Sequence, residues 1–320
     1  METRSSQDRV HRLSFDVEWP PGHVACYLID GPGPILVDAA APGETKALEN
    51  ALSGCGYSID DIDHLLITHP HVDHVGGVPT IIEAADPTVY APVGVERRFT
   101  QSREELETRV RRNCRAAGFS GDALESVVGE AVELRDRNVE LLSPESVDVW
   151  IAPGEPVSVG QLEFEGVHLP GHQADHLSYR TEIAGDRVLL AGDMGIEPFR
   201  PIVLHERLDD GYRDAFDAFY RALDRMADLD VDLVYPGHGP IHDDLPGAVE
   251  RDRSSLDSRL DRVAELVADG QATAAAVAET IAGGHESQYL VPEAMGALAY
   301  LEEHGRVTSE SQNGVRRYDA

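Results

Sequence analysis

Four potential metal ligands are concentrated in one short segment, THPHVDHVGG, at residues 68–77. The segment follows the apolar run HLLI and ends in two glycines, which allow a close turn into the next helix. Neutral imidazole nitrogens and carboxylate oxygens bind zinc and similar divalent cations where no thiolate is present. In this spacing His69 and His71 can face one cation while Asp73 and His74 face a second. The segment therefore indicates a site for two metals.

Three further candidate ligands each end an apolar, strand-like run in a glycine-containing turn. His172 lies in LPGHQ, Asp193 in LLAGD and His238 in YPGHG. A single histidine after Pro-Gly is commonly only a turn residue, and an aspartate after glycine commonly forms a turn or caps a helix. The agreement among the three segments favours ligands of one shared centre.

The order of these motifs, HxHxDH, PGH, GD and PGHG, preceded by Val37 and Asp38, resembles the metallo-β-lactamase superfamily over about residues 13–245. The resemblance implies an α/β fold, the αββα sandwich, with the metals at one edge between two sheets. It implies one metal held by His69, His71 and His172, a second held by Asp73, His74 and His238, and Asp193 bridging both.

The resemblance also implies two supporting residues. Asp38 would orient the ligand loop rather than bind metal, as carboxylates outside the ligand set do for metal-bound histidines. His176, in HQADH, is similar in place to a second histidine common in the superfamily, and we expect it to form a hydrogen bond beside the ligands.

Such a centre is suited to hydrolysis. Two cations about 3.5 to 4 Å apart lower the pKa of a shared water toward about 7 and polarise the substrate oxygen. The expected nucleophile is a hydroxide that bridges the metals, and Asp73 is the expected catalytic residue that takes up its proton. Zinc is the expected metal, and iron or manganese also suits these ligands.

The surrounding patterns predict a layered α/β domain. Apolar runs at 24–30, 35–38 and 64–68 are typical of strands, and 44–54 has helical spacing. This order places the histidine cluster at the C-terminal tip of a strand, where active-site loops of such folds lie. The charged, helical pattern at 95–142 predicts a helical insertion.

The end of the chain resembles a small winged-helix domain. We therefore divide the chain into a catalytic domain at 1–248 and a winged-helix-like domain at 249–320. The insertion and the C-terminal helices are expected to wall the substrate pocket. The predicted elements are helices at about 250–269, 273–282 and 292–303 and a hairpin that turns at Asn313 and Gly314.

The net charge of −31 is spread along the whole chain, and Lys46 is the only lysine. This composition indicates adaptation to high salt rather than an acidic interaction tail. The three cysteines lie far apart without CxxC spacing, which disfavours disulfides and thiolate metal sites. The chain shows neither a signal-peptide pattern nor a membrane-spanning apolar run, so we expect a cytoplasmic protein that does not bind membranes.

Two kinds of substrate fit the motifs. His74 in HxHxDH resembles branches that include glyoxalase II, a thioesterase. PGHQADH resembles PGHTDDH of the lactamase-β-like-2 type, which carries a C-terminal winged helix and includes RNA endonucleases. Arg306, Arg316 and Arg317 are too few for a strong phosphate footprint.

We therefore favour a hydrolase of small-molecule esters or thioesters, with a metal-dependent endoribonuclease as the alternative. A purely structural metal protein is disfavoured because structural zinc sites are closed cages of four ligands. The sequence leaves a homodimer open, since a winged helix can serve as a dimerisation element.

Overall fold

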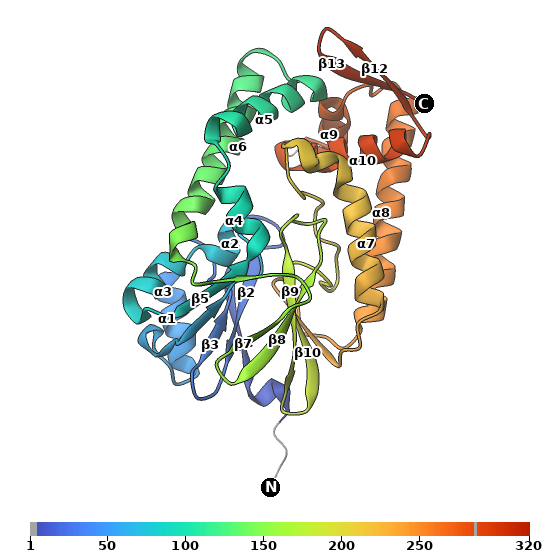
Figure 1. Cartoon of the computed structure of the whole chain (residues 1–320). Helices are drawn as coiled ribbons and strands as arrows, with labels where there is room; N and C mark the ends of the chain where they lie inside the picture. Colours follow the sequence, from blue (N-terminus) through green and yellow to red (C-terminus); the bar gives the residue numbers. More distant parts are fainter. Residues whose placement is uncertain (1–4, 285–286) are drawn as a thin grey trace.

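The computed structural model describes residues 5–284 and 287–320. Two β-sheets face each other, and helices cover the outer face of each, as Figure 1 shows. The predicted αββα sandwich is confirmed by this arrangement. Within the described residues, no helix is both long and apolar enough to span a membrane.

The first sheet contains six strands in sequence order. β1, β2 and β3 pair antiparallel, and β3 to β6 pair parallel. Its outer face is covered by α1 (Thr45–Gly54) and α3 (Val78–Ala85), which bury Leu48, Leu52 and Ile81 at helical spacing. The strands are β1 (Val10–Asp16), β2 (His23–Ile29), β3 (Ile35–Val37), β4 (His64–Leu66), β5 (Thr88–Pro92) and β6 (Val149–Ile151).

The second sheet contains five strands in the order β11-β10-β9-β8-β7. Its outer face is covered by α7 (Ala215–Ala227), which buries Phe216, Phe219 and Leu223, and α8 (Leu245–Ala268) packs against α7. The strands are β7 (Pro156–Val159), β8 (Leu162–His168), β9 (Leu177–Ile183), β10 (Asp186–Gly192) and β11 (Leu233–Pro236).

Two buried tyrosines join the sheets close to the predicted ligands. The Tyr27 hydroxyl on β2 donates to the carbonyl of Pro236, 2.7 Å away, the first residue of the PGHG turn. The Tyr179 hydroxyl on β9 donates to the carbonyl of Ile67, also at 2.7 Å, directly before the histidine cluster. Burying a hydroxyl is unfavourable unless it forms a hydrogen bond, so these two contacts are expected to persist. They fix the ligand-bearing loops of the two sheets relative to each other.

The helical insertion lies between β5 and β6 and covers one end of the sandwich (Figure 1). Its elements are α4 (Val93–Phe99), α5 (Arg103–Ala117) and α6 (Gly121–Leu141). The predicted range, 95–142, agrees with these bounds to within two residues.

The C-terminal elements also lie close to their predicted positions. α8 and α10 share an apolar core with α7, and the boundary predicted after residue 248 falls in the first turns of α8. The division at that residue and the winged-helix assignment remain predictions. The elements after α8 are α9 (Ala274–Ala282), α10 (Val291–Glu303), β12 (Thr308–Gln312) and β13 (Val315–Asp319).

Candidate metal centre

The seven predicted ligands lie together at one edge of the sandwich. Their segments follow the C-terminal ends of β4 in the first sheet and of β8, β10 and β11 in the second. All seven side chains are buried. They form two groups within which the ligand atoms lie no more than 4.8 Å apart, namely His69, His71, His172 and Asp193, and Asp73, His74 and His238.

The first group surrounds a small space. His71 Nδ1 lies 3.1 Å from His69 Nε2 and 2.9 Å from His172 Nε2. Asp193 Oδ2 lies 3.2 Å from His172 Nε2 and 3.8 Å from His69 Nε2. For comparison, ligands at about 2.0 to 2.1 Å from a tetrahedral zinc lie about 3.3 Å from one another. These spacings fit one divalent cation at the centre of the group.

The second group is joined to the first by Asp193. Asp193 Oδ1 lies 3.1 Å from His74 Nε2, and Asp193 Oδ2 lies 3.3 Å from His238 Nε2. Asp73 Oδ2 completes the group at 3.6 Å from His238 Nε2. One carboxylate therefore faces both groups, which is the position that a bridging ligand requires.

The outward ring nitrogens of the five histidines all face oxygen atoms. A ring nitrogen beside a carbonyl or carboxylate oxygen carries the hydrogen, so the inward nitrogen is left with a free lone pair. The outward contacts are His69 Nδ1 to Thr68 Oγ1 at 3.0 Å, His71 Nε2 to Gln173 Oε1 at 3.0 Å, His74 Nδ1 to Asp38 Oδ2 at 2.8 Å, His172 Nδ1 to Ile202 O at 2.9 Å and His238 Nδ1 to His23 O at 2.5 Å.

This pattern tests whether the residues fit metal ions. In the first group, lone pairs of three imidazoles point at one another across 2.9 to 3.1 Å. Lone pairs at this distance repel unless a proton or a cation lies among them. The hydrogens of His69 and His172 lie on the outward side, and with the Gln173 oxygen toward His71 the same holds for His71, so that a divalent cation satisfies all three nitrogens at once. The donor set therefore fits the expected metals.

Gln173 couples His71 to the helical insertion. With its oxygen toward His71, its amide nitrogen faces the guanidinium of Arg98 on α4. The reversed amide would donate to His71 Nε2 and accept from Arg98 Nη2 at 3.1 Å. A metal on His71 Nδ1 requires hydrogen on Nε2, and hence the orientation with the oxygen toward His71.

Asp38 supports the centre from the end of β3. Its carboxylate accepts hydrogen bonds from the Thr68 amide and hydroxyl, each at 2.8 Å, in addition to the contact with His74. Its backbone φ is 61°, a left-handed conformation that is uncommon outside glycine. Asp38 thereby fixes both the start of the histidine segment and one ring within it.

His176 and two glycines shape the space around Asp193. His176 Nε2 accepts a hydrogen bond from the Asp193 amide at 3.0 Å. A Cβ on Gly192, whose φ is 53°, would lie 2.6 Å from His176 Nε2. A Cβ on Gly237 would lie 2.6 Å from Asp193 Oδ1 and 2.7 Å from His74 Cε1. Only glycine allows these strand ends to approach the ligands so closely.

The charges of the ligands are set by their surroundings. Burial, together with neighbouring imidazoles, lowers the pKa values of His69 and His71 well below 6.5, so both are neutral ligands. Burial alone would lower the pKa of His74, but the carboxylates of Asp193 and Asp38 raise it well above 6.5. Burial opposes ionisation of Asp193, yet His238 and His74 hold its pKa well below 3.8. The bridging position therefore carries a negative charge.

Several residues of the site were not predicted from the sequence. Thr68, His23 and Gln173 contact ligands but were not assigned roles there. Thr68 and Gln173 adjoin predicted ligands in the chain, so adjacency was an available signal. His23 contributes its backbone carbonyl, which no residue type reveals.

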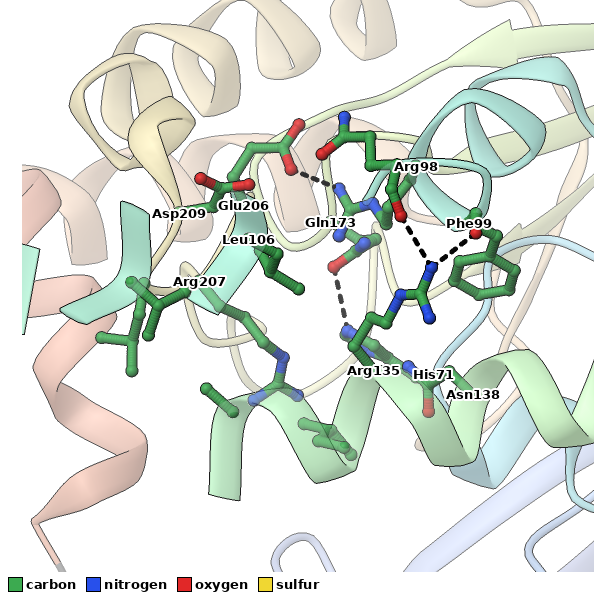
Figure 2. A pocket seen from close by; sticks show the side chains of 15 residues that line it. His71, Arg98, Phe99, Leu106, Arg135, Asn138, Gln173, Glu206, Arg207 and Asp209 are labelled. Carbon is green, nitrogen blue, oxygen red and sulfur yellow. Dashed lines mark hydrogen bonds and ion pairs between the residues drawn. The ribbon is translucent and has the colours of Figure 1, made fainter. Parts of the chain in front are cut away.

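A pocket adjoins His71 between the insertion and the loop after β10. Its empty space, part of it open to solvent, is about 620 Å³. Figure 2 shows charged side chains reaching into it from α4, from α6 and from the loop. All of its described lining residues precede residue 210, so the expectation that the C-terminal helices also wall the substrate pocket stays a prediction. Its apolar lining consists of Phe99, Leu106, Val110, Ala131, Leu134 and Leu208.

Comparison with known families identifies the class of protein. Residues 19–238 match the Metallo-beta-lactamase superfamily. The chain therefore belongs to this superfamily, and it is a metal-dependent hydrolase. The resemblance inferred from the motifs is confirmed.

The chain is similar to several characterised or named relatives. It is 23% identical over 298 residues to the probable metallo-hydrolase YqjP of Bacillus subtilis, across 90% of each chain. It is 23% identical over 233 residues to the beta-lactamase-like protein 2 homolog of Caenorhabditis elegans, across 73% of this chain and 60% of that protein. It is 26% identical over 255 residues to the hydroxyacylglutathione hydrolase of Methylobacterium nodulans, across 77% and 71%.

The whole fold has a counterpart among solved structures. The metallo-beta-lactamase family protein TTHA1429 of Thermus thermophilus superposes with a TM-score of 0.78 at 23% identity. The match covers 98% of this chain and 99% of that one. The shared fold thus includes the insertion and the C-terminal elements.

Proposed function

We propose that the chain hydrolyses small-molecule esters or thioesters at a dinuclear metal centre. His69, His71 and His172 would hold one ion, Asp73, His74 and His238 would hold the other, and Asp193 faces both groups. Zinc is the proposed metal, and iron or manganese fits the same ligands. When bound, the two ions supply an activated water and polarise the substrate oxygen.

The residues of the chain accept the released proton and hold the ligands in position. Asp73, on the side of the centre that faces His238, takes up the proton released as the new bond forms. Asp38 and His176 act on the centre through His74 and Asp193, whose positions they fix by hydrogen bonds. Both are positioning residues.

The pocket beside His71 is the observation that carries the choice of a small substrate. The insertion closes over the metal edge, and the space left beside His71 has a mixed apolar and polar lining. A concave space with apolar walls and a few polar groups is the usual form of a small-molecule site. Single-stranded RNA instead needs an open, positively charged groove.

The C-terminal arginines support the same choice over an endoribonuclease. Arg306 pairs with Asp261 at 2.8 Å, and Arg316 pairs with Glu302 at 2.6 Å. These pairs neutralise two of the three arginines that could contribute to phosphate binding, on a chain whose net charge is −31. Because the chain is similar to a beta-lactamase-like protein 2 homolog, a metal-dependent endoribonuclease remains the alternative function.

The decisive assay offers both substrates to the metal-loaded protein. S-lactoyl thioesters and single-stranded RNA would be incubated with the wild type, with His69→Ala and with a His11→Ala control on β1, away from the centre. We expect thioester hydrolysis that His69→Ala abolishes and His11→Ala leaves intact. RNA cleavage that depends on His69, with thioesters untouched, would show that the proposal is wrong.

We further propose that the protein works in the cytoplasm of a high-salt cell and that the winged-helix-like region at 249–320 mediates a homodimer. The support is the dispersed acidic charge and the set of three helices with a hairpin. Sedimentation of the full chain tests the dimer. A monomer across micromolar concentrations in molar salt would contradict it.

A further inference from the structure

Arginine side chains from three segments line the pocket beside the metal centre, and two of them are paired. Arg98 of α4 pairs with Asp175 at 2.6 Å and Glu206 at 2.8 Å. Arg135 of α6 donates to the carbonyls of Phe99 at 2.6 Å and Gln101 at 3.1 Å. These two cations are neutralised or bonded within the fold.

The third arginine, Arg207, differs from both. Across residues 5–284 and 287–320, no carboxylate lies within 4 Å of its guanidinium and no hydrogen bond to it is present. The side chain is half-buried and extends from its loop into the pocket, as Figure 2 shows. Its φ of 54° is a left-handed conformation, so the loop holds this residue in a backbone geometry that side chains rarely adopt.

Arg207 is charged although it is half-buried in the pocket that His71 also lines. Burial and the nearby Arg98 lower the pKa of Arg207 to about 10, while Asp73 opposes that shift. The guanidinium is thus charged at neutral pH. A half-buried, unpaired cation is unfavourable unless an anion binds to it.

We propose that Arg207 binds a carboxylate carried by the substrate, next to the ester or thioester that is hydrolysed. A guanidinium presents a planar fork of donors that matches a carboxylate in two parallel hydrogen bonds. The apolar residues beside it, Leu106, Val110 and Leu208, would contact the carbon chain that links the two groups. This inference rests on the proposed function and narrows the substrate to short acidic acyl compounds.

The first test measures binding without turnover. Glutarate and inorganic phosphate would be titrated calorimetrically into the zinc-loaded wild type, Arg207→Met, Arg207→Lys and an Arg213→Met control. Arg213 is exposed, lies over the Tyr212 ring and does not line the pocket. We expect glutarate to bind at least tenfold more weakly to Arg207→Met, less weakly to Arg207→Lys, and unchanged to Arg213→Met.

Two results of the titration would overturn the inference. One is equal glutarate affinity for the wild type and Arg207→Met, with equal zinc content and circular dichroism spectra. The other is an Arg207 dependence confined to phosphate, which would replace the carboxylate by a phosphate group. If Arg207→Met does not fold, the comparison is made between the wild type and Arg207→Lys, which retains the positive charge.

The second test compares matched esters. p-Nitrophenyl succinate carries a carboxylate that p-nitrophenyl pentanoate lacks. Arg207→Met is expected to raise KM at least tenfold for the succinate and less than twofold for the pentanoate, with kcat for the pentanoate unchanged. A wild type that hydrolyses neither ester would contradict the proposed function, while the glutarate titration would still decide the role of Arg207.

Discussion

Asp38 Oδ2 lies 2.8 Å from His74 Nδ1, and the same carboxylate accepts two hydrogen bonds from Thr68. A residue that binds no metal therefore holds one ligand and the beginning of the ligand segment. Asp38→Asn keeps the size of the side chain but removes its charge. We expect metal affinity to fall about 10- to 100-fold, as it does when such partners are lost. Competition with a chromogenic chelator measures this, and Asp16→Asn, at an exposed site on β1, should behave as the wild type.

The two ligand groups predict two metal equivalents per chain. His238→Ala removes one ligand of the second group and leaves the first group, with Asp193, complete. Elemental analysis after gel filtration is expected to find about two equivalents in the wild type and about one in His238→Ala. A single equivalent in the wild type would argue against the dinuclear centre.

The buried pairs of Arg98 predict a large loss of stability on its removal. Arg98→Met leaves Asp175, which is 4% exposed, and the half-buried Glu206 without their cation. Removing one partner of such a pair typically costs about 3 to 5 kcal/mol. Arg103→Met breaks solvent-exposed pairs with Asp136 and Glu107 and should cost less than about 1 kcal/mol. Denaturant unfolding of both variants would show the difference, and equal losses would contradict it.

Asp252 on α8 predicts a pH-dependent contribution to folding. Its side chain is buried, and burial raises its pKa to about 6 despite Arg251. Because the folded chain holds this proton more tightly than the unfolded chain, the contribution stabilises the fold at low pH and is lost as the pH rises from about 4 to 6. Asp252→Asn removes the titration.

Relative to Asp252→Asn, the wild type should therefore lose about 1 kcal/mol of unfolding free energy between pH 5 and pH 7.5. Urea unfolding at the two pH values measures this loss. The exposed Asp243→Asn serves as the control, and it should leave the pH dependence of the wild type unchanged. A constant difference between wild type and Asp252→Asn would contradict the prediction.

The net charge of −31 predicts stabilisation by salt. Carboxylates that repel one another in dilute buffer are screened at molar salt, where the Debye length is about 3 Å. We expect Tm to rise by at least about 5 °C between 0.1 M and 3 M KCl, equivalent to roughly 3 kcal/mol for a chain of this size. Sucrose of matched osmolarity controls for excluded volume, and an equal rise in sucrose would argue against charge screening.

The grouping of the ligands could be predicted from sequence because each ligand sits in a short motif directly after an apolar strand. Strand ends at one sheet edge bring such residues together whatever the intervening chain does. The same local reasoning predicted the hairpin that turns at Asn313 and Gly314, which separate β12 from β13.

Features that depend on distant packing could not be predicted in this way. β1 (Val10–Asp16) was not recognised as a strand. Polar and charged residues separate its three buried apolar side chains, Val10, Leu13 and Phe15, so the apolar pattern is weak. The helical insertion was predicted to line the pocket, but no motif reveals that the loop at 206–209 also faces it. Arg207 belongs to that loop and carries no sequence signature.

The ligands of each group come from loops of both sheets, and this arrangement has a mechanical consequence. A cation bound among them would link the two halves of the sandwich at the edge where Tyr27 and Tyr179 also join the strand ends by hydrogen bonds. Chelation would then destabilise the fold as well as abolish hydrolysis. Loss of a single ligand would weaken the contact between the two halves and lower turnover together.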